Sequence, residues 1–123
     1  MNNYVKFNQS EEDYIESILT LSRTQSVVHR IDIAKRMNVS QAAVNKAVKL
    51  LLEKEYIYED GKHLYLTSVG KKYAEDVYEK HCIIRDFLIQ NGVSPTTAEE
   101  DACAMEHVVS QETVDVMKAA LKR

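Results

Sequence analysis

The chain has 123 residues, of which 45% are hydrophobic and 28% charged, so it fits one or two small globular domains and excludes a large enzyme. One proline and three glycines favour a mostly helical fold and exclude collagen-like and low-complexity classes. No apolar run approaches the roughly 20 residues of a membrane span, and the polar, acidic N-terminus is unlike a signal peptide. Two cysteines make no disulfide framework, so we expect a cytoplasmic protein with free thiols.

Charge is distributed unevenly along the chain. The net charge is −3, from 16 basic and 19 acidic residues. Between positions 22 and 54, however, there are seven basic and only two acidic residues, a net charge of +5, so the rest of the chain carries −8. A basic block in an acidic chain predicts one surface that binds a polyanion and another that binds something positive.

The first half of the chain has the pattern of a helix-turn-helix. A helix is predicted from about Ser10 to Ser22, and a short one over Ile31–Met37. The apolar spacing over Gln41–Lys54 is that of an amphipathic helix, with Ser40 as its N-cap. Only three residues separate the last two helices, which is the helix-turn-helix signature.

Two short β runs come next. Tyr56–Tyr58 and His63–Leu66 flank a segment that contains Asp60-Gly61, a strong hairpin turn signal. A hairpin directly after the second helix of a helix-turn-helix is a wing. The sequence therefore predicts a winged helix-turn-helix domain over residues 1–67.

The remainder of the chain is predicted to be entirely helical. A long helix is expected over residues 68–90, a second over 95–108 with Pro95 in its first turn, and a last one after Ser110 as N-cap. The predicted fold class is thus mostly α, with the winged helix-turn-helix followed by an all-helical unit over residues 68–123.

The predicted helix at Gln41–Lys54 carries polar side chains on its outer face. Gln41 and Asn45 are residue types that read adenine edges in a major groove, and Lys46 and Lys49 can pair with phosphates or guanine. The alternative is the solvated face of an ordinary surface helix. Its place in the basic block and before a hairpin favours DNA binding.

A candidate metal half-site lies in the predicted helix over 95–108. Cys103, Glu106 and His107 are spaced i, i+3 and i+4, which places a thiolate, a carboxylate and an imidazole on one helix face. The alternative is a small buried cysteine beside two surface residues.

Three further residues could supply ligands. Asp13 and Glu16 form an i, i+3 carboxylate pair on the first predicted helix, and His81 lies midway along the long one. The alternative for Asp13 and Glu16 is that acids are favoured near a helix N-terminus. The alternative for His81 is a partly buried histidine bonded to a backbone carbonyl.

Catalytic motifs are absent from the sequence. It contains no HExxH, no glycine-rich phosphate loop and no GxSxG. A nucleophile pair of Cys103 and His107 has no obvious third member. We therefore predict that the protein is not an enzyme.

Four segments together resemble a known family. They are Glu12–Glu16 with the sequence EDYIE, Asp32–Ala34 with Val39-Ser40, Leu66-Thr67-x-x-Gly70, and C-x-x-E-H-V-x-S from Cys103 to Ser110. In this order around a winged helix, over about residues 10–121, they resemble the DtxR/MntR family of metal-dependent transcriptional repressors. The resemblance implies a winged helix followed by a helical dimerisation and metal-binding domain.

The resemblance also implies which residues bind metal and DNA. The metal ligands would be Asp13, Glu16, His81, Cys103, Glu106 and His107, a hybrid of the acidic start of manganese-type members and the cysteine of iron-type members. Arg85 and Glu99 stand where iron-type members have a carboxylate and a histidine in an ancillary site. The DNA-contacting residues would be Ser40, Gln41, Ala42, Ala43, Asn45, Lys46 and Lys49, in a region where many relatives have a proline.

The sequence thus predicts a homodimeric repressor activated by a divalent metal ion. Ligands from both halves would clamp the winged helices at the spacing of a palindromic operator in double-stranded DNA. The thiolate favours Fe²⁺ and the carboxylates favour Mn²⁺, with a slight preference for Fe²⁺ and one or two ions per subunit. No membrane partner or small-molecule substrate is expected. The alternatives are a regulator gated by a small molecule or by oxidation of Cys103, and a helical metal-dependent enzyme or metal-handling protein.

Overall fold

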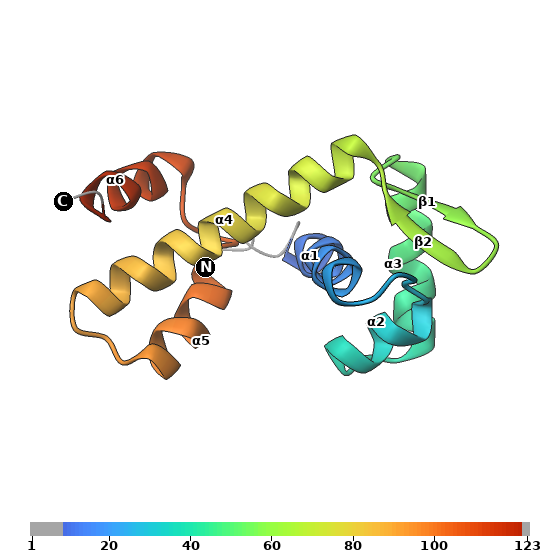
Figure 1. Cartoon of the computed structure of the whole chain (residues 1–123), viewed down its shortest axis with the longest axis horizontal. Coiled ribbons are helices and arrows are strands. Elements are labelled where there is room, and N and C mark those ends of the chain that lie inside the picture. Colours follow the sequence, from blue (N-terminus) through green and yellow to red (C-terminus); the bar gives the residue numbers. More distant parts are fainter. Residues whose placement is uncertain (1–8, 122–123) are drawn as a thin grey trace, which may run out of the picture. The chain divides into compact units, whose positions relative to one another are not determined.

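The computed structural model describes residues 9–121, in which six helices and one two-stranded antiparallel sheet occur (Figure 1). In chain order the elements are α1 (Gln9–Thr24), α2 (Arg30–Met37), α3 (Gln41–Glu53), β1 (Ile57–Asp60), β2 (His63–Leu66), α4 (Ser68–Gln90), α5 (Pro95–Met105) and α6 (Gln111–Leu121). The predicted fold class is confirmed. None of the helices described here is long and apolar enough to cross a membrane.

The described residues form two compact units that divide within α4. The first is Gln9–Glu75, and the second holds residues 76–121. Each unit has its own hydrophobic core.

The core of the first unit fixes one side of α3. Val44, Val48 and Leu51 recur on that side and are at most 2% exposed. Side chains from α1, α2, both strands and the start of α4 complete the core, among them Ile15, Ile18, Ile33, Ala34, Ile57, Leu64 and Ala74. Because packing holds this side of α3, its opposite side is left exposed at a defined orientation.

Local backbone features build the turn between α2 and α3. Asn38 adopts the left-handed conformation, with φ of 56°, at the end of α2. Ser40 then caps α3, since its Oγ accepts a hydrogen bond from the N–H of Ala43 at 3.1 Å. The predicted helix-turn-helix is therefore confirmed.

The wing differs from the prediction by one position in its turn. The pairing of β1 with β2 runs from Ile57 opposite Leu66 to Asp60 opposite His63, so the two turn residues are Gly61 and Lys62. The sequence predicts Asp60-Gly61 as the turn instead. Gly61 has φ of 63°, and a glycine at the first central position is what type II′ hairpin turns favour. Asp60 is therefore the last residue of β1.

The motif Leu66-Thr67-x-x-Gly70 joins the wing to α4. The hydroxyl of Thr67 donates to the carbonyl of Glu55 at 2.7 Å and accepts from the N–H of Gly70 at 3.0 Å. The N–H of Thr67 donates to the carbonyl of Tyr56 at 3.0 Å. A Cβ atom on Gly70 would lie 1.8 Å from that carbonyl oxygen, so only glycine fits there.

Glu11 on α1 connects two other helices of the first unit. Its carboxylate accepts hydrogen bonds from Nζ of Lys54, at the end of α3, and from the hydroxyl of Tyr73 on α4, the latter at 2.9 Å. Burial and this hydrogen bond raise the pKa of Tyr73 above its ordinary value. The first two turns of α4 are thus attached to the first unit.

The second unit packs the rest of α4 with α5 and α6. Ile83, Ile84, Ala102 and Val114 are its buried residues, and partly buried side chains such as Leu88 pack against them. The helix α5 ends at Met105, earlier than the predicted end at Val108, and Glu106 is its C-cap. Ser110 precedes α6, and its Oγ accepts a hydrogen bond from the N–H of Thr113 at 3.2 Å.

Candidate metal centre and nucleic-acid interface

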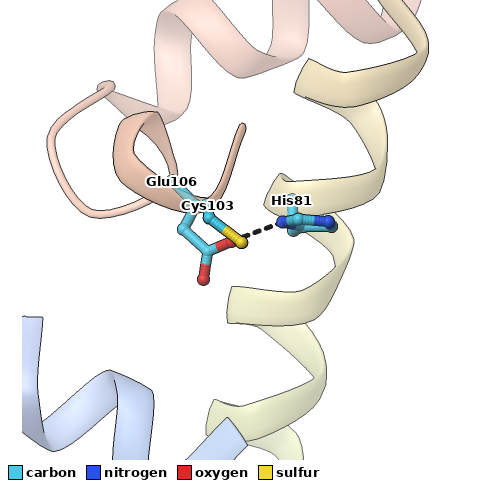
Figure 2. Close-up of side chains that lie close together, drawn as sticks. All are labelled: His81, Cys103 and Glu106. Atoms are coloured by element: carbon cyan, nitrogen blue, oxygen red, sulfur yellow. Dashed lines mark hydrogen bonds and ion pairs between the residues drawn. The ribbon is translucent and has the colours of Figure 1, made fainter. Parts of the chain in front are cut away.

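Three potential metal ligands meet in the second unit. They are His81 from α4, Cys103 from α5 and Glu106 at the C-cap of α5, and one donor atom of each lies within 4.8 Å of the others. Figure 2 shows the Cys103 sulfur and the Glu106 carboxylate pointing toward the ring of His81. The set offers sulfur, nitrogen and oxygen donors in one place, a combination suited to a divalent transition metal.

Both ring nitrogens of His81 face carboxylates. Nδ1 lies 2.8 Å from Oε1 of Glu106, and Nε2 lies 2.7 Å from Oε2 of Glu99. His81 is 5% exposed and Glu106 only 2%. The hydrogen bond to Glu106 raises the pKa of His81, and the charges of both glutamates act in the same direction against the opposing effect of burial.

The second carboxylate oxygen of Glu106 has no hydrogen-bond partner among the described residues. This atom, Oε2, is buried, and Nε2 of His107 lies 3.8 Å from it. A buried carboxylate oxygen without a donor is costly, and a cation would satisfy it. The residues therefore fit a bound metal ion by both donor chemistry and an unsatisfied buried atom.

The geometry of this cluster differs from the predicted helix face. Because α5 ends at Met105, Glu106 and His107 lie in the turn after the helix, where the N–H of His107 reaches the carbonyl of Ala104 at 3.4 Å. The thiol of Cys103 is exposed, whereas the side chain of His107 is 2% exposed. The chain thus turns the imidazole and carboxylate inward and leaves the thiol accessible.

Asp13 and Glu16 belong to the first unit. Both lie on α1, and together with Ser17, Arg36 and Met37 they line a pocket of about 390 Å³. Their carboxylates therefore open onto a hollow on the surface of this unit, with a basic side chain at its edge.

Sequence reasoning did not identify Glu99 as a partner of His81. Its other oxygen, Oε1, lies 3.8 Å from a guanidinium nitrogen of Arg85, which also donates from Nε to Asp86 at 3.0 Å. The signal was present, because Glu99 precedes Cys103 by four residues and hence lies one helical turn away on α5. The two positions that depart from the iron-type ancillary site thus face each other.

Most of the predicted DNA-contacting residues lie on the exposed side of α3. Ser40, Gln41, Ala42, Asn45, Lys46 and Lys49 are exposed, and Ala43 is partly buried. These residues line the open side of α3 opposite its buried face. The arrangement offers hydrogen-bonding and cationic groups to a groove of DNA.

Arg30 was missed as an individual residue of this face, although it was counted in the basic block. It is the first residue of α2, and it contacts Asn45 of α3 and Glu59 of β1. A pocket of about 580 Å³ beside it is lined by His29, Arg30, Ile31, Gln41, Glu59 and Lys62. The exposed face of α3 therefore continues onto the start of α2 and the wing.

Comparison with known proteins matches nearly the whole chain to one family of regulators. Residues 6–64 match the family described as "Iron dependent repressor, N-terminal DNA binding domain", and residues 67–123 match "Iron dependent repressor, metal binding and dimerisation domain". The transcriptional regulator MntR of Escherichia coli O6:H1 is 39% identical over 108 residues, which cover 87% of this chain and 70% of the relative.

Two other similar proteins differ in how much of their own length this chain covers. The HTH-type transcriptional regulator MJ0568 of Methanocaldococcus jannaschii is 32% identical over 119 residues, covering 94% of this chain and 95% of the relative. A solved structure of the manganese regulator SloR superposes with a TM-score of 0.80 at 32% identity, covering 91% of this chain. The chain spans only 53% of that SloR chain. These similarities show that the chain belongs to the DtxR/MntR family of metal-dependent transcriptional regulators.

Proposed function

We propose that this protein is a homodimeric transcriptional repressor that a divalent metal ion activates for binding to a palindromic operator. The observation that carries the proposal is the buried pair of His81 and Glu106 beside Cys103, with one carboxylate oxygen left without a donor. Residues 1–67 would bind DNA, and residues 68–123 would dimerise and hold metal.

The proposed ligands come from both units. Asp13 and Glu16 would act from the first, and His81, Cys103, Glu106 and His107 from the second. With neutral histidines and a Cys103 thiolate, these six groups carry four negative charges, which repel one another. A bound divalent ion would supply the positive charge that offsets this repulsion. We favour Fe²⁺ slightly over Mn²⁺ because of the thiolate, with one or two ions per subunit.

Ligation from both units would give DNA binding its metal dependence. Side chains that bind one metal centre would restrict the two units to fewer relative orientations. The loss of conformational entropy on DNA binding would then be smaller. In a dimer, the two α3 helices must meet major grooves about 34–36 Å apart, or a multiple of that distance. The exposed residues of α3 then contact base edges, and its lysines contact phosphates.

The decisive experiment compares DNA affinity with and without metal. Fluorescence anisotropy with a mixed pool of labelled duplexes is run anaerobically at fixed salt, with Fe²⁺ or Mn²⁺ and then with chelator. Metal at 100 times its dissociation constant stabilises a state that alone binds it by about 2.7 kcal/mol, roughly a hundredfold in affinity. We expect a reversible increase of tenfold or more.

Equal affinity in the presence of chelator would overturn the metal gate. Oxidation of the exposed thiol of Cys103 would then be the next candidate, because that gate needs an accessible sulfur and no metal. Repeating the titration with thiol oxidant and reductant in place of metal and chelator separates the two mechanisms.

A second prediction concerns the lysines of α3. Replacing exposed Lys49 with alanine should weaken binding to all duplexes about equally and reduce the slope of log affinity against log salt by about one, because one phosphate contact is lost. The matched control is Lys118→Ala on α6, which removes the same charge from the other unit. The contact with phosphate is contradicted if both variants show the wild-type salt dependence.

A further inference from the structure

Arg30 ties three elements of the first unit together at the DNA-reading face. Its guanidinium forms a bidentate ion pair with the carboxylate of Glu59 on β1, with contacts of 2.9, 3.0 and 3.2 Å. A further nitrogen of the same group donates to Oδ1 of Asn45 on α3 at 3.0 Å. About a third of the Arg30 side chain is exposed, so the contact lies at the edge of the surface rather than in the core.

This contact fixes the direction of the Asn45 amide. A guanidinium has only donors, so the amide oxygen must face Arg30 and the amide NH₂ must face away from it. The bidentate ion pair with Glu59 orients the planar guanidinium and thereby holds this arrangement. Asn45 is itself exposed on α3, and both N–H donors of its NH₂ group are turned away from Arg30 toward a ligand.

The available group decides which base edge Asn45 can read. Asparagine recognises adenine through two bonds, in which its oxygen accepts from N6 and its nitrogen donates to N7. Arg30 occupies one of the two acceptor positions of the oxygen and holds it toward α2, so that the NH₂ donor is the group turned away from Arg30. Guanine offers two acceptors in the major groove, O6 and N7, whereas adenine places its own donor next to N7.

We propose that Arg30 is a positioning residue that makes Asn45 select guanine over adenine at one operator position, with Glu59 holding Arg30 in place. The proposal rests on the proposed function, because it needs α3 to lie in a major groove. Glu59 has a second effect: it places a negative charge on the DNA-facing side of the wing and neutralises the arginine there.

The test is selection of operators from a random duplex library by the whole 123-residue chain loaded with metal, followed by anisotropy on the selected sequences. The position that Asn45 reads is identified as the one whose preference Asn45→Ala removes. We expect wild type to prefer guanine over adenine there by about tenfold. Arg30→Ala should move this preference toward adenine, because the amide becomes free to rotate.

Two further variants separate this effect from charge and folding. Lys35→Ala removes an exposed positive charge from the same helix and should weaken binding without changing the preferred base. Glu59→Gln keeps the size of the side chain and loosens the hold on Arg30, so it should move the preference in the same direction as Arg30→Ala, but less, even where the latter is poorly folded.

The outcomes are distinct. If wild type enriches no sequence with metal present, the proposed function fails and this inference fails with it. If wild type selects an operator with adenine at the Asn45 position, the inference alone is overturned. It is also overturned if Arg30→Ala and Glu59→Gln lower or raise affinity for all duplexes equally, since Arg30 would then act only as a phosphate contact.

Discussion

Replacing Glu106 with glutamine should abolish the increase in DNA affinity that metal produces. Glutamine has nearly the same volume and can still accept the hydrogen bond from His81, but it lacks the negative charge and is a weak ligand. We expect the roughly hundredfold gain at saturating metal to fall below about threefold. The measurement is the anisotropy titration with Fe²⁺ or Mn²⁺ and with chelator, accompanied by a circular dichroism spectrum.

The matched control is Glu100→Gln, an exposed carboxylate on α5 that lies outside the cluster. It should respond to metal as wild type does. Because Glu106 is buried, its variant could lose stability for structural reasons; Cys103→Ser changes an exposed thiol and therefore tests the same centre without disturbing the core. Retention of the full metal response by both Glu106→Gln and Cys103→Ser would contradict this assignment of ligands.

Replacing Gly70 with alanine should strongly destabilise the first unit. The added methyl group would lie 1.8 Å from the carbonyl oxygen of Tyr56, and that atom is backbone and already accepts the N–H of Thr67. The collision can be relieved only if the start of α4 moves away from Tyr56, the residue that precedes β1. That movement would break the hydrogen bonds that Thr67 makes to Gly70 on one side and to Glu55 and Tyr56 on the other. We expect the free energy of unfolding to fall by at least about 1–3 kcal/mol, the usual cost of overpacking.

Urea denaturation followed by circular dichroism measures this effect. The control is Val69→Ala, the neighbouring position in the first turn of α4, whose side chain is 62% exposed and whose loss should change stability by less than about 0.5 kcal/mol. Equal unfolding midpoints for the two variants would show that the chain accommodates the methyl group at position 70.

Local signals predicted most of the fold. The apolar spacing of α3 and the cap at Ser40 depend on residues close in sequence, and both are confirmed. The turn of the wing lies one residue later than predicted. Asp60-Gly61 and Gly61-Lys62 are both acceptable turn sequences, and the pairing of the strands decides between them.

The site was harder to predict because its contacts are tertiary. The spacing of Cys103, Glu106 and His107 suggested one helix face, but α5 ends before the last two of them. The approach of His81 to Glu106 joins residues 25 positions apart, and no periodicity encodes it. Family resemblance supplied that pair.

Arg30 illustrates the same limit on the DNA-reading side. Its partners lie 15 and 29 residues away in sequence, on α3 and on the wing. A count of charges placed it in a basic block, but a count says nothing about which neighbours neutralise it. The contacts of Arg30 therefore depend on the packing of the hairpin beside α3, which the sequence pattern does not specify.

The attachment of the first turns of α4 has a practical consequence for dissecting the molecule. Tyr73 is bonded to Glu11, and Ala74 is fully buried in the core of the first unit. A fragment cut after Thr67 would retain every residue proposed to touch DNA and yet lose part of the scaffold that shapes them. An isolated DNA-binding fragment for spectroscopy should therefore extend through residue 75, the last of the first compact unit. Such a fragment retains the whole hydrophobic core of that unit.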